Sequence, residues 1–355
     1  MSRTSHPTSL GESWKRMALR AQAMPAWLGV DAPSQDVVLS SRVRVMRNLR
    51  DYPFPAAATD ADLAAVVKQV QSAVKRSGVE LWGEKGLTNA ERDYLVSCRL
   101  ISPDFRWREL GRAVFLDPAK KVSLMVNEED HLRIQALTAG WSLPSADLAA
   151  RALLDALSPH LEFARDAEWG YLAAGPLNCG TGRRFSAMMH LVALAQSPRW
   201  REVLAAMLSH GFTARGLFGE ASRAVGAFFQ VSSTHGDRSA FIGACDYLIE
   251  QERAARQEAA IEDVAAKTAA AVRYVFQSPS LSLADALRVV SWVRWTASLG
   301  LPPFEGKVRE VDRWFALLEV RTVSDRDADA RARADFLRAR FDELGVASSP
   351  LLTWS

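Results

Sequence analysis

Residues 123–133 (SLMVNEEDHLR) place the densest group of reactive side chains directly after a short apolar run. The apolar residues suit a buried strand, and the asparagine and acids that follow suit the turn where a strand ends. Because side chains alternate along a strand, Glu128 and Glu129 should face opposite ways, and only one of them should enter a given cleft. Three neighbouring acids repel one another, so cations should balance them. A solvated turn that caps a helix is the alternative interpretation of this stretch alone.

Arginines that could supply this counter-charge occur earlier in the chain at strand-like spacing. Residues 36–50 begin as an apolar run and continue as Ser-Arg-Val-Arg-Val from Ser41, which puts Arg42 and Arg44 on one face of a strand. Burying two guanidinium groups without anions is costly. On the floor of a cleft they would form a phosphate site, because one planar guanidinium group can donate two parallel hydrogen bonds to phosphate oxygens.

A glycine-containing stretch, residues 175–185 (GPLNCGTGRRF), also favours anions. Gly180 and Gly182 precede a pair of arginines, and we expect a helix over residues 186–195 directly after them. Free backbone N–H groups and a helix N-terminus beside two arginines would bind an anion. The stretch lacks the third glycine of a dinucleotide fingerprint and the GK[ST] ending of a P-loop. A plain turn is the alternative.

Residues 214–226 (ARGLFGEASRAVG) combine Arg215 with two glycines, which suit a closing loop, and with Glu220. With the arginines above, they supply what phosphoryl transfer needs: cations to neutralise a triphosphate and carboxylates to handle the acceptor. Glu129 would orient and deprotonate the acceptor. If the acceptor is a guanidinium group, Glu220 could hold its fork of donors.

Composition excludes several other classes of protein. A chain of 355 residues with 48% hydrophobic and 24% charged residues is typical of a soluble globular protein, and its net charge of +3 is small. No apolar run reaches the roughly 18 residues of a membrane span, and the N-terminal residues lack the apolar core of a secretory signal. Cys98, Cys179 and Cys245 give no disulfide framework, and the six histidines show no zinc-like pairing with them. We therefore expect a cytoplasmic protein that binds neither nucleic acid nor membranes. We assign none of its side chains as metal ligands.

Hydrophobic spacing predicts the elements that must position these residues. A hairpin is expected from residues 113–116 and 122–126, and a strand over 163–173. Helices are expected over residues 13–22, 60–77, 89–100 and 144–157. Four more helices are expected over residues 249–277, 281–299, 307–320 and 326–344.

Four motifs, in this order and spacing, resemble the phosphagen (guanidino) kinase superfamily: SSRVRVMRN, NEEDHLR, NCGTGRR and ARGLFGE. Within it, the chain is most similar to the bacterial protein-arginine kinases of the McsB type. The resemblance runs from about residue 36 to residue 256 and continues more weakly to the C-terminus. It implies phosphorylation of arginine side chains in proteins with ATP and Mg²⁺, which marks those proteins for degradation.

The resemblance also implies a role for each motif residue. Glu129 is expected to be the catalytic base, and Glu220 the second contact of the acceptor guanidinium. The residues expected to bind the nucleotide are Ser41, Arg42, Arg44, Arg133, Gly180, Gly182, Arg184 and Arg215.

The chain departs from the family pattern at three places. Gly175 stands where such kinases usually have a cysteine, and Cys179, four positions on, is expected to pack as a small apolar residue. Arg99 stands where the family tends to have a histidine near the adenine, although a guanidinium can also stack on a base. Near the C-terminus, residues 326–332 approximate the family's phosphoarginine-sensing RDxxRA pattern with one extra residue. On a helix, one extra residue rotates Arg331-Ala332 by about 100° relative to its place in the family pattern. A solvated, arginine-rich helix is therefore the favoured interpretation of this stretch.

The resemblance implies an α+β fold, with a mostly antiparallel sheet flanked by helices and followed by an all-helical domain. We expect an N-terminal leader over residues 1–34, a catalytic domain over 35–256 and the helical domain over 257–355. Trp292, Trp295 and Trp314 on amphipathic helices suggest a homodimer, with a role in the core of the monomer as the alternative. The expected partners are protein substrates with exposed arginines, an activator protein and a protease or chaperone machinery.

Two other functions fit part of this pattern. One is a kinase for a small guanidino compound, but such kinases carry a large helical domain before the SSRVR strand, and here only about 40 residues precede it. The other is a regulator that binds nucleotide or phosphoarginine without turnover, which the changes at Gly175 and Arg99 suggest. Retention of the arginines and both glutamates argues against the regulator.

Overall fold

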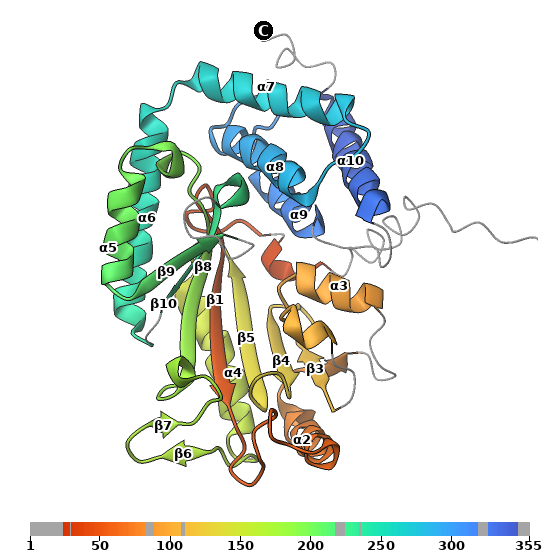
Figure 1. Cartoon of the computed structure of the whole chain (residues 1–355), viewed down its shortest axis with the longest axis vertical. Coiled ribbons are helices and arrows are strands. Elements are labelled where there is room, and N and C mark those ends of the chain that lie inside the picture. The colour runs from red at the N-terminus through yellow and green to blue at the C-terminus, as the bar shows by residue number, and fades with distance from the viewer. Residues whose placement is uncertain are drawn as a thin grey trace, which may run out of the picture.

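Strand β1 (Val38–Arg47) lies in the middle of an eight-stranded sheet, between β5 (Leu132–Ala139) and β8 (Arg183–His190). Every pair of neighbouring strands in this sheet is antiparallel. The strand order is β2-β3-β4-β5-β1-β8-β10-β9 (Figure 1). The other five strands are β2 (Glu80–Trp82), β3 (Ala113–Leu116), β4 (Val122–Val126), β9 (Phe212–Gly216) and β10 (Phe228–Ser233). The sheet confirms the expected α+β fold.

The computed structural model describes residues 24–28, 30–82, 89–107, 111–216, 224–233, 236–318 and 326–346. The helix expected over residues 13–22 lies outside these ranges, as does Glu220 with the rest of residues 217–223. Within the described ranges, no helix is long and apolar enough to cross a bilayer.

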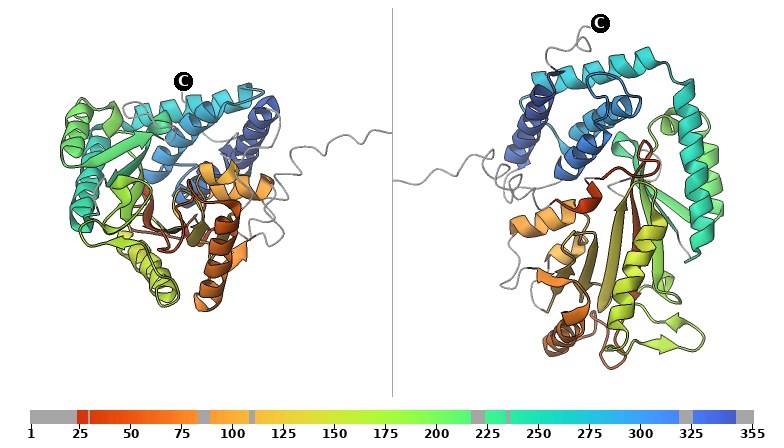
Figure 2. Two further views of the ribbon diagram at one scale, coloured as in Figure 1. Left: turned by 60° about the horizontal axis from the view of Figure 1, so that its bottom comes forward. Right: turned by 180° about the vertical axis from the view of Figure 1, so that it is seen from behind.

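Helices cover one face of the sheet because the apolar side chains of its strands alternate toward that face. Val43 and Val45 of β1, together with Phe185 of β8, are buried there in a large apolar core. The right-hand view of Figure 2, from behind, shows the helices on this face. They are α2 (Asp60–Ala73), α4 (Leu143–Leu157), α5 (Trp200–Ser209) and α6 (Arg238–Glu258).

The opposite face of the sheet, which we call the front face, is covered only in part. Helix α3 (Asn89–Ser97) and the residues after it pack against β3 and β4 through Leu95, Leu100 and Met125. At the upper end in Figure 1, four helices share a second core that includes Leu39 of β1 and Phe228 of β10. They are α7 (Ile261–Gln277), α8 (Leu283–Ser298), α9 (Val308–Leu318) and α10 (Arg326–Glu343).

The segment after the glycine loop is a strand, so the helix expected over residues 186–195 is wrong. Phe185, Ala187 and Met189 of β8 point into the core, and the alternate residues face the front. The alternation predicts a strand, whereas the apolar content of the same residues also suits a helix. Pairing with β1 and β10, which are distant in sequence, decides the outcome.

Two further expectations need correction. The strand expected over residues 163–173 is a small hairpin of β6 (Arg165–Asp166) and β7 (Gly170–Tyr171), because the Asp166 side chain accepts bonds from the N–H groups of Glu168 and Trp169 and turns the chain. The long helix expected over residues 249–277 is two helices, α6 and α7. The backbone of Ala259 and Ala260 is extended between them.

The tryptophans expected to form a dimer interface are mostly inside the chain. Trp314 and Trp295 are 2% and 3% exposed, and the Trp292 ring stacks on Trp295 with centroids 5.5 Å apart. Their burial matches the core alternative, so the homodimer stays a prediction without this support.

Candidate active site

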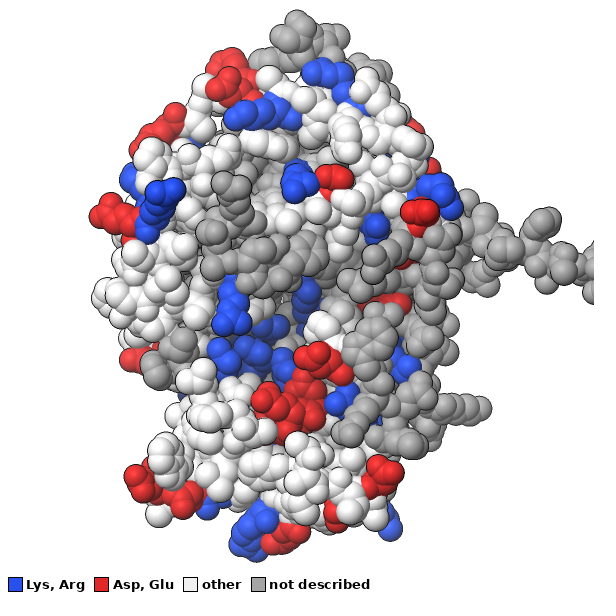
Figure 3. All heavy atoms as spheres, in the orientation of Figure 1, with Lys and Arg blue, Asp and Glu red and all other residues white. Residues whose placement is uncertain are grey.

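The front face of the sheet collects arginines from four strands. Arg44 of β1 lies directly opposite Arg184 of β8, and Arg215 of β9 pairs with Gln230 of β10. Arg133 of β5 pairs with Met46, two residues beyond Arg44 and therefore on the same face. Arg42 completes this set, which we call the arginine cluster. Figure 3 shows basic side chains gathered in a central hollow, with acidic ones beside them.

The arginines of the cluster repel one another because they lie close together, and all of them except the exposed Arg215 are partly buried. Burial, and then the charges of Arg133, Arg99 and Arg184, lower the pKa of Arg42 to about 9. Burial and the neighbouring arginines also lower the pKa of Arg44, whose buried Nε has no hydrogen-bond partner in the described residues. A polyanion would relieve this repulsion and satisfy such donors.

Two neutral side chains on the front face hold one of these guanidinium groups. Arg42 donates from Nε to Ser186 Oγ (3.0 Å) and from Nη2 to Gln230 Oε1 (2.9 Å). Neither partner adds a negative charge, so the positive charge of Arg42 remains available to a ligand.

Glu128 and Glu129 lie in the turn between β4 and β5 and not on a strand, and their environments differ because their partners differ. Glu128 is bound by Arg133 Nη1 at 2.5 Å and by the Ser102 hydroxyl. Burial would raise the pKa of Glu128, but Arg133 and Ser102 outweigh it and lower that pKa. The ionised form of Glu128 is therefore favoured, and its ion pair holds Arg133 at the edge of the cluster.

Glu129 is the carboxylate available for chemistry. In the described residues its side chain has no hydrogen bond or ion pair, and it feels the charges of Arg133 and Arg184. Burial, followed by Asp130 and Glu128, nevertheless raises its pKa. A raised pKa makes a carboxylate a stronger base. Glu129 can thus accept a proton from a group that reacts beside the arginine cluster.

Gly175 lies against this carboxylate. A Cβ at position 175 would stand 3.3 Å from Glu129 Oε1 and 3.2 Å from Asn178 Nδ2. The position that departs from the family pattern is therefore next to the expected base. The sulfur of half-buried Cys179 contacts the backbone of Ala173 and Gly175 instead.

Asp130 is a positioning residue for this loop. Its Oδ1 accepts bonds from Asn48 Nδ2 (2.6 Å) and from the Ala174 N–H (2.7 Å), and the side chain is buried. Asn48 Oδ1 in turn accepts from the His131 N–H at 2.8 Å. These bonds tie the end of β1, the turn before β5 and the loop at Gly175 into one unit.

The backbone conformation favours glycine at both of the positions expected to bind nucleotide. Gly180 and Gly182 have φ angles of +87° and +63°, which side chains disfavour. A Cβ on Gly182 would stand 2.6 Å from Met46 O, so this turn packs directly on the end of β1. Contact of their N–H groups with phosphate stays a prediction.

Ser41 is not part of the cluster. Its hydroxyl donates to Gly140 O (2.8 Å) and accepts from the Ser142 N–H (3.0 Å), on the face of the sheet that packs against α4. Alternation along β1 puts Ser41 and Arg42 on opposite faces, so the Ser41 hydroxyl does not face the cluster.

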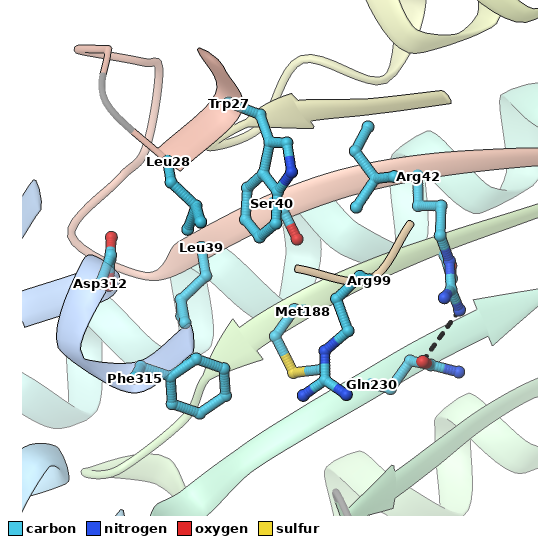
Figure 4. A pocket seen from close by; sticks show the side chains of 12 residues that line it. Trp27, Leu28, Leu39, Ser40, Arg42, Arg99, Met188, Gln230, Asp312 and Phe315 are labelled. Atoms are coloured by element: carbon cyan, nitrogen blue, oxygen red, sulfur yellow. Dashed lines mark hydrogen bonds between the residues drawn. The ribbon is translucent and has the colours of Figure 1, made fainter. Parts of the chain in front are cut away.

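A narrow pocket continues from the arginine cluster toward the C-terminal helices (Figure 4). Arg42 belongs to both, and Arg99, which follows α3 with a φ of +60°, lines the pocket as well. Half of its lining residues are apolar: Trp27, Leu28, Leu39, Leu137, Met188 and Phe315. A flat group attached to an anion could therefore lie here while its anion contacts the cluster.

Comparisons with known proteins show what the chain is similar to. A model of the ATP:guanido phosphotransferase C-terminal catalytic domain matches residues 63–237. A protein-arginine kinase of Halothermothrix orenii is 35% identical over 291 residues, which cover 78% of this chain and 82% of that protein. The chain belongs to the protein-arginine kinase family. A protein-arginine kinase of Moorella thermoacetica is 42% identical over 224 residues, which cover 61% of this chain and 64% of that protein.

Solved structures show the same fold as this family member. Lombricine kinase has a TM-score of 0.55 at 21% identity, covering 68% of this chain and 72% of that one. A duplicated taurocyamine kinase of Schistosoma mansoni, with bound transition-state analog components, has a TM-score of 0.56 at 23% identity. That match covers 63% of this chain and 34% of the other. The guanidino kinase fold is therefore confirmed.

Two arginines of α10 in this family member have structural roles. Arg333 donates to Leu281 O (3.0 Å), and Arg338 donates to Val275 O (3.1 Å) and Ser278 O (2.7 Å). They satisfy carbonyl groups at and beyond the end of α7. Both arginines lie outside residues 326–332, for which the favoured interpretation as a solvated, arginine-rich helix stays a prediction.

Several site residues were not identified from the sequence of this family member. Ser102, Ser186 and Gln230 bind the charged groups, and Asn48 holds Asp130. Asn48 ends the motif SSRVRVMRN, which was a signal for it, whereas the single serines and Gln230 belong to none of the four motifs. In the described residues, no three His, Cys, Asp or Glu side chains are grouped as metal ligands.

Proposed function

We propose that this chain is a kinase that transfers the γ-phosphoryl group of ATP to the guanidinium group of arginine side chains in proteins. One observation carries the proposal: four strands bring five arginines to one face of the sheet, next to Glu129, which has a raised pKa. Phosphoryl transfer asks little covalent chemistry of a protein and depends on charge neutralisation and alignment.

In the proposed reaction, a guanidinium nitrogen attacks the γ-phosphorus as the bond from that phosphorus to the β,γ-bridging oxygen breaks. The proton leaves this nitrogen for the Glu129 carboxylate, and ADP leaves with the electron pair. The arginine cluster neutralises the charge that develops on the phosphate oxygens. Glu220 is assigned as the second contact of the acceptor, by resemblance alone.

The narrow pocket beside Arg42 is the proposed site of the nucleotide base. A triphosphate on the cluster would leave the base within reach of this pocket, whose apolar side chains suit a planar ring. Mg²⁺ would be carried by the phosphates, because it retains water and phosphate ligands in preference to an all-protein cage. When bound, it neutralises and aligns the β- and γ-phosphate oxygens.

A protein-borne arginine is the proposed acceptor because the relatives at 35–42% identity are named protein-arginine kinases. Phosphorylation replaces a cation by an anion, which a degradation machinery could recognise. We include an activator protein and such a machinery in the cytoplasm as proposed partners.

The test is to incubate the purified protein with ATP·Mg²⁺ and casein, an arginine-containing unfolded protein, and to detect phosphoarginine by mass spectrometry. A parallel tube contains free arginine in place of casein. We expect phosphate on casein arginines. Phosphate on free arginine alone would assign the chain to the small-molecule kinases. Nucleotide binding without transfer in either tube would favour the regulator.

Glu129→Gln tests the assigned base. The amide cannot take the proton, so we expect turnover to fall by about 10²–10⁴-fold while ATP binds within a few-fold of the wild-type affinity. Steady-state rates and calorimetric titration measure the two effects. Glu80→Gln, an exposed change at the edge of the sheet, is the matched control and should alter neither. A near-normal rate in Glu129→Gln would show that another group is the base.

A further inference from the structure

The proposed base pocket is not built by the sheet alone. Its floor consists of front-face residues of the sheet, but Asp312 and Phe315 of α9 line it as well. Figure 4 shows Phe315 reaching the pocket from the side opposite Arg42. A helix of the C-terminal group therefore supplies part of a pocket whose other end is the arginine cluster.

Aromatic packing determines where the Phe315 ring lies. Its centroid is 4.5 Å from that of Phe228, at the start of β10, and Phe228 stacks on His190, at the end of β8, at 4.7 Å. The next residue, Trp314, packs against Phe341 in the helical core. Helix α9 thus presents one ring to the strand ends and another to its own helices.

Hydrogen bonds connect Asp312 to the residues just before β1. Its carboxylate accepts from Arg294 Nε at 2.6 Å and from Gln35 Nε2 at 3.4 Å. Arg294 also donates to Gln35 O (2.7 Å) and Asp36 O (2.9 Å). All of Arg294 and nearly all of Asp312 are buried, so this network is shielded from water and salt.

The same residues therefore link pocket and cluster. The backbone held by Arg294 lies two residues before β1, and β1 carries both Ser40 of the pocket floor and Arg42 of the cluster. Arg256 of α6 adds a third bond to this segment, from Nη1 to Asp36 O at 3.0 Å. A displacement of α9 would move a wall of the pocket and loosen the entry to its floor.

We propose that α9 is part of the nucleotide site, with Phe315 as a wall of the base pocket and Asp312 as the residue that aligns this wall with β1. The inference rests on the proposed function for the identity of the ligand. Its consequence is that binding of the nucleoside part of ATP requires the C-terminal helices to be seated on the sheet, whereas binding of the phosphates does not.

Inorganic tripolyphosphate is the probe that separates the two parts, because it has the charge of the ATP tail and no base. We compare the dissociation constants of ATP and tripolyphosphate, both with Mg²⁺, for the wild-type chain and Phe315→Leu. Contact of a base with an aromatic ring is worth enough that ATP binding should weaken by about tenfold. Tripolyphosphate binding should change by less than about twofold, since the cluster is untouched.

Phe304→Leu is the matched control. Phe304 is a fully buried ring in the same helical core, packed against Phe341, and it does not line the pocket. We expect it to leave the ratio of the two dissociation constants as in the wild type. If Phe315→Leu binds ATP normally, or weakens both ligands equally, the proposal is wrong.

Hydrogen exchange of the wild-type protein provides a test that requires no variant. ATP should slow amide exchange across residues 308–318, and tripolyphosphate should not. Equal exchange in this helix with either ligand would overturn the proposal. All of these readouts are of binding, so failure of α9 to respond is distinct from a failure to form phosphoarginine, which would contradict the proposed function instead.

Discussion

At the scale of single residues, the two neighbouring glutamates differ in their partners. The Glu128 carboxylate accepts bonds from Arg133 and Ser102, whereas the Glu129 carboxylate has neither bond and lies near the acidic side chains of Asp130 and Glu128. The pKa of Glu128 falls, and that of Glu129 rises. A carboxylate with a raised pKa beside a group of arginines is suited to accept a proton there.

The pH dependence of the rate should report this environment. Glu129 must be ionised to act as a base, so activity should fall as the pH drops through its raised pKa. Asp130→Asn removes one of the charges that raise this pKa and can keep the bond from Ala174 to Oδ1. The acidic limb of the profile should therefore move to lower pH.

The control for this profile is Asp155→Asn, an exposed change on α4. It should leave the acidic limb in place. If Asp130→Asn does not move the limb, or moves it upward, then Glu129 is not the group that titrates in it.

At the scale of elements, the turn over Gly180–Gly182 must fit closely against the end of β1. Met46 donates its N–H to Gly182 O at 2.8 Å, and Arg47 donates from Nη1 to Met46 O and Thr181 O. These contacts leave no space for a side chain at Gly182, whereas only Trp169 O, at 3.9 Å, lies near a Cβ at Gly180. Strand β8 follows this turn, so the turn also determines that Arg184 lies opposite Arg44.

Alanine at each glycine separates backbone strain from close packing. Both substitutions force a side chain into left-handed backbone, which costs about 1–2 kcal/mol. Gly182→Ala must also displace Met46 O, so we expect its free energy of unfolding to fall by about 2–4 kcal/mol, against about 1–2 kcal/mol for Gly180→Ala. Urea unfolding of the two variants measures this difference, and equal losses would contradict the packing argument.

At the scale of the whole molecule, a buried polar network joins the C-terminal helices to the sheet. His190, at the end of β8, bonds Ser291 of α8 at 2.8 Å and stacks on Phe228. Burial, and then Arg294 and Arg256, lower the pKa of His190 well below its ordinary value. The imidazole is therefore neutral in the folded protein.

Acid should consequently weaken this junction. The unfolded chain binds a proton at His190 below its ordinary pKa of about 6.5, and the folded chain does not, so stability is lost as the pH falls below that value. One such proton costs about 1.4 kcal/mol per pH unit. Thermal unfolding between pH 7.5 and 5.5 should show a smaller loss for His190→Gln than for the wild type.

His160→Gln, at an exposed histidine, is the control and should retain the wild-type pH dependence of stability. If His190→Gln retains it too, the buried histidine does not account for the loss of stability in acid.

The sequence by itself determined the chemistry of the site and part of its frame. Alternation put Arg42 and Arg44 on one face of a strand, and the hairpin of β3 and β4 lies where its apolar runs predicted. These signals are local, since a period of two and a turn residue act within a few positions. The motifs also indicated the family to which the chain belongs.

Only the tertiary structure decided which distant residues meet. Residues 186–190 became strand because β1 and β10 pair with β8, and Ser41 faces away because the helices cover that side of the sheet. Gln230, Ser186 and Phe315 entered the site through contacts across more than a hundred positions in sequence. Such contacts depend on long-range packing, which overrides local propensity and leaves no periodic signal in the chain.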